Sequence, residues 1–215
     1  MGVAHRLAAR RRSLLRYERA LWARGVTRVA GVDEVGVGPL AGPLVAAAVI
    51  LPQEIGLRGV DDSKKLSAAV RERLSAEIRA RAVAIGLGIA TVEEVDRLNT
   101  FWAALLAMRR AVLALPLSAE HLLVDGRRIP DLDLPQERLI KGDSRSYSIA
   151  AASIVAKVER DAMMHAHDRA YPEYGFAHHM GYGTPEHLAA LSRHGPCPIH
   201  RRSFIPVSQA RLPGL

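Results

Sequence analysis

Four acidic residues stand where predicted apolar strands end. They are Asp33, Glu34, Asp125 and Asp143, which close or follow the segments 28–35, 121–125 and 138–141. Burying a carboxylate away from water is costly unless a cation or a hydrogen-bonding partner compensates its charge. Acids at one edge of an α/β sheet would converge on one site, where their charges repel and raise one another's pKa values. The pattern therefore indicates a site that takes a cation.

A pair of Mg²⁺ or Mn²⁺ ions is the cofactor that this acid set favours, because both are hard cations that prefer oxygen ligands. Two such ions, about 3.5–4 Å apart, suit phosphodiester hydrolysis: one activates water and the other stabilises the leaving oxygen. Adjacent strand residues point to opposite faces, so Asp33 and Glu34 share a site only if the strand bends, which Gly36 and Gly38 permit. For any single acid, a helix cap or a turn is the alternative explanation, but it is weaker for all four.

The rest of the chain predicts the elements that carry these acids. Apolar segments predict strands at 28–35, 43–51, 83–90, 121–125 and 138–141. Helical patterns predict helices over 4–25, 67–82, 93–114 and 143–171. Strands that alternate with helices indicate an α/β domain.

Particular side chains refine the helices. Ser67 is a predicted N-cap, as is Ser144 or Ser146 in the last of these helices. The stripe of the third helix that is predicted to face the core consists of Phe101, Leu105, Met108 and Val112. The small residues of the fourth helix are Ser148, Ala151, Ala152 and Ser153, which predict close packing against a sheet.

The composition indicates a basic protein. Thirty Lys and Arg against 22 Asp and Glu give a net charge of +8 and a pI near 10.2, which favours a nucleic-acid partner over a merely basic, soluble surface. The 215 residues fit one catalytic domain at 28–215, preceded by a basic N-terminal helix at 1–27, and we expect a monomer. The single cysteine, Cys197, indicates a reducing compartment, and no apolar run reaches the ~20 residues of a membrane span. We therefore expect a cytoplasmic location and no membrane partner.

The sequence disfavours two other kinds of site. The segment from Gly36 to Ala41 matches the G-x-G-x-x-A dinucleotide fingerprint, but Pro43 would fall inside the helix that this motif opens, at a cost of ~3 kcal/mol. A zinc site is the second, with the candidate ligands His187, His194, Cys197 and His200. Prolines flank the cysteine and no paired C-x-x-C supports it, so we expect these four to be surface or loop residues.

Six motifs, in this order and spacing, resemble bacterial ribonuclease HII, the type 2 ribonuclease H family. They are GVDEVGVGPLAGPLVAAAVIL, DDSKKLS, LVDG, KGDSRSYSIAAASIVAKVERD, GYGT and GPCPIHRRSF, and the similarity spans about residues 29–205. The resemblance implies a ribonuclease H-like α/β fold, with a five-stranded mixed sheet flanked by helices and a helical part at about 173–215. It also implies that the four acids are the catalytic metal ligands.

By this resemblance the substrates are RNA/DNA hybrids and DNA duplexes that contain a ribonucleotide. The family cuts the phosphodiester 5′ of the ribonucleotide and leaves 3′-hydroxyl and 5′-phosphate ends. Tyr182 matches the family tyrosine that stacks on the following deoxyribose. Lys64, Lys157 and Arg160 are further candidate substrate contacts, although Lys157 and Arg160 could equally pair with acids of the site.

The chain departs from the family at two cationic positions. The family's glycine-arginine-glycine motif, which holds the 2′-hydroxyl and a phosphate, reads Gly36-Val37-Gly38, and Met180 replaces a lysine. Each lost phosphate contact weakens binding and flattens its salt dependence. We expect an active enzyme with a weaker grip on its substrate or a weaker junction preference. The alternative is a hybrid-binding protein whose cleavage is weak or lost.

Overall fold

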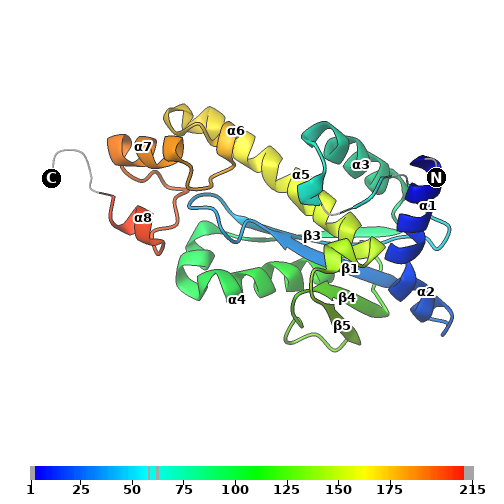
Figure 1. Cartoon of the computed structure of the whole chain (residues 1–215). Coiled ribbons are helices and arrows are strands. Elements are labelled where there is room, and N and C mark those ends of the chain that lie inside the picture. The colour runs from blue at the N-terminus through cyan, green and yellow to red at the C-terminus, as the bar shows by residue number, and fades with distance from the viewer. Residues whose placement is uncertain (1–2, 58, 62, 211–215) are drawn as a thin grey trace.

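A five-stranded mixed sheet organises the chain (Figure 1). The computed structural model describes residues 3–57, 59–61 and 63–210, so that Asp62 of the DDSKKLS motif and residues 211–215 of the predicted C-terminal part lie outside it. The strands are β1 (Val29–Val35), β2 (Leu44–Ile50), β3 (Ala84–Ala90), β4 (His121–Asp125) and β5 (Gln136–Leu139), in the spatial order β3-β2-β1-β4-β5. β1, β2 and β3 are antiparallel neighbours, whereas β1, β4 and β5 run parallel. The predicted fold class is confirmed.

The last strand lies earlier than the sequence predicts. β5 begins at Gln136 and not at Arg138. A hydrogen bond from the amide of Leu122 to the carbonyl of Pro135 comes directly before it. β5 ends before Lys141, whose left-handed backbone (φ 54°) leaves the strand conformation. Asp143, the acid predicted to follow this strand, therefore lies in a short 3₁₀ turn, η2 (Gly142–Ser144).

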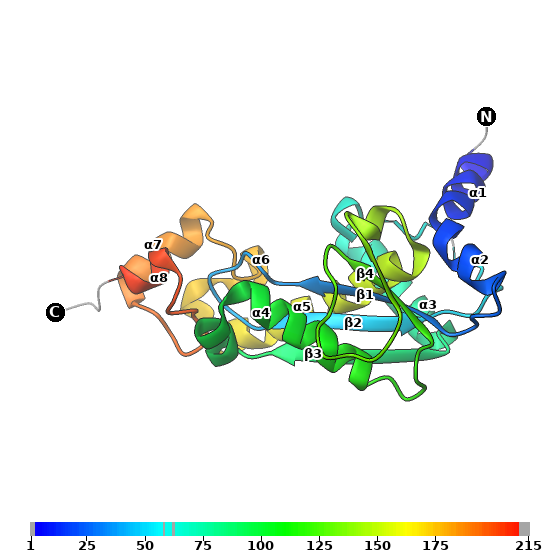
Figure 2. The ribbon, with the colours of Figure 1, turned by 90° about the horizontal axis from the view of Figure 1, so that it is seen from below.

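Helices cover both faces of the sheet. They are α1 (Val3–Leu14), α2 (Arg16–Trp22), α3 (Ala68–Arg81), α4 (Val92–Leu113), α5 (Tyr147–Ala170), α6 (Phe176–His179), α7 (Pro185–His194) and α8 (Ile205–Ser208), with 3₁₀ turns η1 (Ser63–Lys65) and η3 (Pro172–Tyr174). α4 lies on one face, and α5 crosses the other with α3 beside it (Figures 1 and 2). α7 and α8 lie at the end of the molecule opposite α1 and α2 (Figure 1).

Glycines in the strands let the helices approach the sheet closely. A Cβ at Gly31 of β1 would lie 2.0 Å from the carbonyl carbon of Ser148 in α5, and one at Gly88 of β3 would lie 2.0 Å from the Ala107 oxygen in α4. The predicted close packing of α5 is confirmed, since its small residues are buried against the sheet. Ser146 caps α5 by accepting the amide of Ile149, whereas Ser67 stands at the start of α3 without a side-chain cap bond.

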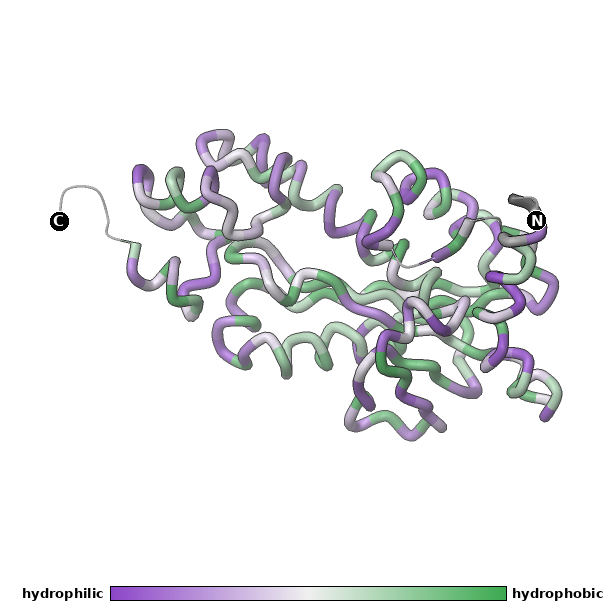
Figure 3. Tube along the Cα trace, in the orientation of Figure 1, coloured by the Kyte–Doolittle hydropathy of each residue, from purple (hydrophilic) through white to green (hydrophobic). Residues whose placement is uncertain are grey.

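Alternate residues of β2 face two separate cores. Ala46 and Ala48 pack with α4, whereas Ala47 and Val49 pack with α5 and α3. Hydrophobic residues run along the strands, and hydrophilic residues recur along the helices that cover them (Figure 3). Among the residues that the structure describes, no helix combines the length and apolarity of a membrane span.

The predicted core stripe of α4 is wrong at one position. Leu105, Met108 and Val112 are buried, but Phe101 is 43% exposed. The helix is interrupted at Asn99, which adopts φ 66° and ψ 167°. Phe101 stands in the first turn after this interruption, where its ring contacts the guanidinium of Arg127 and not the core.

The N-terminal segment forms two helices and not the single predicted helix over 4–25. They meet at Leu15, which is buried with Leu14 in the core beneath α5. Glu18 of α2 is 2% exposed and accepts hydrogen bonds from the hydroxyls of Ser146 and Ser148 at 2.6 Å. The N-terminal segment is therefore hydrogen-bonded to the start of α5. The division into an N-terminal helix at 1–27 and a catalytic domain at 28–215 stays a prediction.

Candidate active site

Three of the four predicted acids meet at the ends of β1 and β4. Asp33, Glu34 and Asp125 each offer a carboxylate oxygen, and these oxygens lie within 4.8 Å of one another. The two strands pair in parallel, so both carboxyl ends reach the same edge of the sheet. The chain turns away just beyond, at Gly36, whose φ of 96° is a conformation that glycine adopts without strain.

Burial and repulsion raise the pKa values of two of these acids. Burial, followed by the charges of Glu34 and Asp125, holds the pKa of Asp33 well above its ordinary value. Burial and the charge of Asp125 raise the pKa of Glu34 to about 7. Within the described part of the chain, Glu34 Oε2 is buried without a hydrogen-bond partner. An orphaned oxygen among crowded carboxylates fits a hard divalent cation such as Mg²⁺ or Mn²⁺.

The fourth acid, Asp143, lies beside this trio. It is 7% exposed, and its charge contributes to the raised pKa of Asp33. Lys64 Nζ lies 3.8 Å from Asp143 Oδ2, and its charge lowers the pKa of Glu34. The Lys64 side chain is 84% exposed, so the structure places a predicted substrate contact at the surface of the acid site.

Hydroxyl groups support Asp33 from the side of α5. The hydroxyl of Ser153 opposes the rise in the pKa of Asp33. Ser153 Oγ in turn lies 2.9 Å from the hydroxyl of Ser63, in the DDSKKLS motif. The sequence suggests only a packing role for Ser153, because a small residue in a buried helix carries no signal of its hydrogen-bond partner.

Two loops flank the acids: the glycine loop, residues 36–43, and the tyrosine loop, residues 180–184. The amide of Leu40 donates to the carbonyl of Gly181 at 2.8 Å. A Cβ at Gly38 would lie 3.6 Å from the ring of Tyr182, which is 44% exposed. The structure thus brings the predicted glycines and Tyr182 together, with Val37 half-buried against the core on the α4 side.

A fully buried arginine holds the glycine loop from beneath. Arg201 donates to the carbonyl of Gly36 at 2.6 Å, of Gly42 at 2.9–3.0 Å and of Val37 at 3.1 Å. Burial, followed by the charge of Arg160, lowers the pKa of Arg201 to about 9. The sequence indicates only that Arg201, with Arg202, adds positive charge near the nucleic-acid face. It does not reveal this supporting role, because the partners of Arg201 are backbone carbonyls, which have no residue signature.

A second buried arginine corrects a prediction. Arg160 is suggested by the sequence as a substrate contact or as an ion-pair partner of the acids, but its side chain is 0% exposed. Its guanidinium donates to the carbonyls of Pro43 and Ala41 in the glycine loop and of Met180 in the tyrosine loop, at 3.0–3.1 Å. Arg160 therefore joins the two loops. Lys157, the other such candidate, pairs with Asp161 at 2.6 Å.

The histidine and cysteine cluster is buried, contrary to the expectation of surface residues. His187 Nε2 lies 3.0 Å from His200 Nε2, and Cys197 Sγ lies 3.1 Å from His200 Nδ1. Burial lowers the pKa of both histidines, that of His200 to about 4, and raises the pKa of Cys197 to about 11. His187 Nδ1 lies 2.9 Å from the carbonyl oxygen of Tyr182. The cluster is a neutral hydrogen-bonded support for the tyrosine loop, while His194 is exposed.

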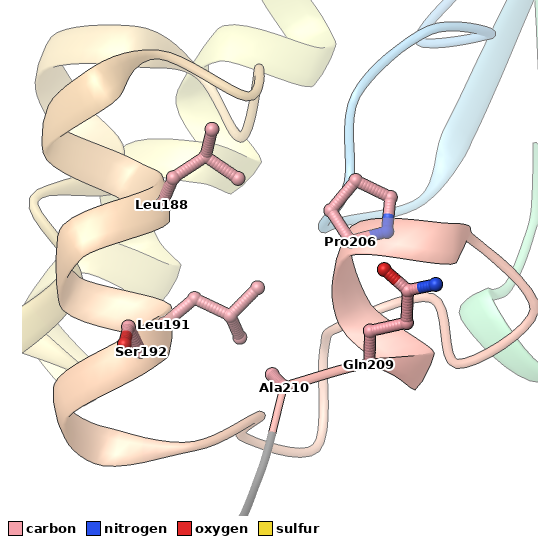
Figure 4. A pocket seen from close by; sticks show the side chains of 6 residues that line it. All are labelled: Leu188, Leu191, Ser192, Pro206, Gln209 and Ala210. Atoms are coloured by element: carbon pink, nitrogen blue, oxygen red, sulfur yellow. The ribbon is translucent and has the colours of Figure 1, made fainter.

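An open pocket lies between α7 and α8 (Figure 4). Its lining residues are Leu188, Leu191, Ser192, Pro206, Gln209 and Ala210. None of them belongs to the predicted site, and the pocket offers no ionisable group to a reaction.

Arg127 is the cation near the acids that the sequence does not reveal. It follows Asp125 by two residues, and its charge is the largest influence that lowers the pKa of Glu34. The pair of arginines after LVDG could have drawn attention to it. The aromatic ring beneath its guanidinium could not, since Phe101 looks like a core residue in the sequence.

The structural comparison defines the class. The chain is similar to ribonuclease H2 from Pyrococcus horikoshii OT3, with a TM-score of 0.72 and 25% identity over 85% of this chain and 96% of that one. Together with the acid cluster at the ends of the parallel strands, this likeness defines a nuclease with the ribonuclease H fold.

Sequence comparison identifies the family within that class. Residues 30–207 match the family model of ribonuclease HII. Ribonuclease HII of Geobacillus thermodenitrificans is 60% identical over 94% of this chain and 79% of its own length, and that of Geobacillus kaustophilus is 58% identical over 95% and 78%. The chain belongs to the ribonuclease HII family and is a ribonuclease H-type endonuclease. Nothing in these comparisons supports the alternative of a binding protein without cleavage.

Proposed function

We propose that this chain cuts the phosphodiester 5′ of a ribonucleotide embedded in duplex DNA, and the RNA strand of RNA/DNA hybrids. The products carry 3′-hydroxyl and 5′-phosphate ends, so the activity serves ribonucleotide removal and primer removal in the cytoplasm. The observation that supports this most is the meeting of the Asp33, Glu34 and Asp125 oxygens within 4.8 Å, beside the glycine and tyrosine loops. The chain acts as a monomer in this proposal.

The acids would hold Mg²⁺ or Mn²⁺, with Asp143 completing the set. When bound, two such ions supply an activated water and stabilise the leaving oxygen. The chain itself fixes the ligands beforehand. Asp125 Oδ1 accepts the amide of Gly142 at 2.5 Å, and Asp33 Oδ1 accepts the amide of Glu34 at 2.8 Å. Such supporting bonds orient carboxylates toward a metal.

The two loops would select the substrate. Because Val37 carries no charge, recognition of the 2′-hydroxyl rests on the backbone of Gly36 and Gly38. The exposed ring of Tyr182 packs on the following deoxyribose, and Lys64 contacts a phosphate near the scissile bond. Lys157 has a weaker claim, because Asp161 already pairs with it.

Cleavage of a DNA duplex with one ribonucleotide, beside an all-RNA/DNA hybrid, tests the proposal. With Mg²⁺ or Mn²⁺ we expect a single cut 5′ of the ribonucleotide, lost when Asp125→Asn removes one ligand. A chain that cuts the hybrid alone would contradict the junction specificity. Binding without any cut in either metal would overturn the enzymatic proposal.

A further inference from the structure

Two aromatic side chains are exposed on α4, next to the acid site. Phe101 is 43% exposed and Trp102 is 53% exposed, and their rings meet edge to face with centroids 5.1 Å apart. Exposed aromatic rings that adjoin charged groups mark binding surfaces more often than isolated apolar residues do. These two rings are not needed by the core, which α4 builds from its other face.

The backbone holds the pair in place. Asn99 adopts a left-handed φ of 66°, which is uncommon outside glycine, and its side-chain oxygen accepts the amides of Phe101 and Trp102 at 2.9 and 3.3 Å. The helix thus restarts at a fixed point, and both aromatic residues stand in its first turn. Strained backbone of this kind persists where the surroundings enforce it, often at functional sites.

Arg127 connects the aromatic pair to the acids. Its guanidinium lies 4.5 Å from the centroid of the Phe101 ring, although the two residues come from different elements. Stacking occupies the flat face of a guanidinium and leaves its N–H donors in the plane, where they can bond a phosphate in bidentate geometry. Arg127 is exposed, and among the described residues it forms no salt bridge.

We propose that Phe101, Trp102 and Arg127 form a nucleic-acid subsite beside the catalytic acids, in which Arg127 binds a backbone phosphate and Trp102 packs against the adjoining sugar. The inference rests on the proposed function, because the scissile phosphate must lie at the acids and the strand must continue past them. Arg127 stands two residues after Asp125, and its positive charge already reaches Glu34. A contiguous cation and aromatic surface suits a strand that presents phosphates and sugars in alternation.

The subsite would supply a phosphate contact that the glycine loop lacks. Val37 stands where the family has an arginine, so that loop brings no side-chain charge to the substrate. Arg127 approaches from the opposite flank, after β4 instead of β1. Arg127 would therefore bind a different phosphate from the one that the family's arginine binds, so the subsite adds affinity without restoring contact at the 2′-hydroxyl.

Tryptophan fluorescence gives a direct test. The chain has two tryptophans, and Trp22 lies in α2, so a Trp22→Phe variant leaves Trp102 as its one fluorophore of this kind. A duplex with one ribonucleotide and a dye at its end is titrated into this variant without divalent metal, so that nothing is cut. We expect the Trp102 emission to change with the same midpoint as the dye anisotropy. Anisotropy that saturates while the emission stays constant would overturn the subsite and leave the proposed function intact.

Steady-state kinetics separates a contact from a structural role. Trp102→Ala should raise KM by roughly 3-fold to 30-fold with little change in kcat, as expected for lost aromatic contacts. Leu113→Ala is the matched control, since Leu113 is 62% exposed at the far end of the same helix. Arg127→Ala should lower the salt dependence of binding by about one phosphate contact. Equal kinetics for the Trp102 and Leu113 variants would contradict the proposal, and the absence of any binding or cleavage by the parent protein would overturn the proposed function with it.

Discussion

The molecule buries charges of both signs around Gly36 and satisfies them in different ways. The positive region consists of Arg160 and Arg201, whose donors bond to backbone carbonyls of the glycine and tyrosine loops. The negative region consists of the acid trio. Among the residues that the structure describes, none forms a hydrogen bond to Glu34 Oε2, and the pKa of Glu34 rises to about 7. The chain completes the first region with its own atoms and leaves the second incomplete.

This difference separates a structural site from a catalytic one. A buried guanidinium surrounded by carbonyls has its hydrogen bonds made, so its removal should damage the fold. Crowded carboxylates that include an oxygen without a hydrogen-bond partner destabilise the metal-free protein. Replacing one of them should therefore lower the rate of cleavage without lowering the stability of the fold. Four experiments test this contrast.

The largest effect is expected from Asp33→Asn. Loss of a metal ligand should reduce cleavage by about 10³-fold, since it removes several kcal/mol of transition-state stabilisation. The same change relieves repulsion, so the melting temperature without metal should stay equal or rise. Glu137→Gln, an exposed acid on β5, is the control for both measurements. A large fall in melting temperature for Asp33→Asn would mean that the acids are structural after all.

Arg201→Met should act in the opposite way. Several buried carbonyls lose their donor, and we expect a loss of about 3–5 kcal/mol in the free energy of unfolding, measured by urea denaturation. Arg202→Met changes the exposed neighbour and should cost little. If Arg201→Met does not fold, Arg201→Lys keeps the charge with fewer donors and should give an intermediate loss. Equal stability of the Arg201 and Arg202 variants would remove the contrast.

The pH dependence of stability is a smaller test of the negative region. The pKa of Glu34 is about 7 in the folded protein against an ordinary 4.5, so between these values the folded state holds the proton more tightly. The free energy of unfolding of the metal-free protein should therefore fall, by about 1–3 kcal/mol, as the pH rises from about 4.5 to about 7. Mg²⁺ should abolish this slope. A metal-free protein that gains stability over the same range would contradict the assignment.

The smallest effect is expected from a positive charge added to the glycine loop, whose carbonyls the two buried arginines bind. Val37→Arg should tighten duplex binding several-fold and steepen its salt dependence by about one phosphate contact. Val37→Gln adds length without charge and should do neither. Filter binding over a series of salt concentrations makes the comparison. If both variants bind like the parent chain, the missing family arginine has no cost here.

The sequence predicts the negative region far better than the positive one. An acid at the end of an apolar strand breaks the usual pattern, and that exception can be recognised along one chain. Arg160 and Arg201 give no such signal, because arginine is ordinarily exposed and their carbonyl partners come from any residue type. The prediction that Phe101 lies in the core fails for a related reason. Helical periodicity shows which residues share a face, but not where the sheet beneath that face ends.

The buried cluster beneath the tyrosine loop has a practical consequence for labelling. Cys197 is the one thiol in the sequence, it is 8% exposed, and burial raises its pKa to about 11. The thiolate is the reactive form, so maleimides and mild oxidants should spare it at neutral pH. A single cysteine introduced on the surface would therefore carry a dye or spin probe alone, and the native residue need not be replaced.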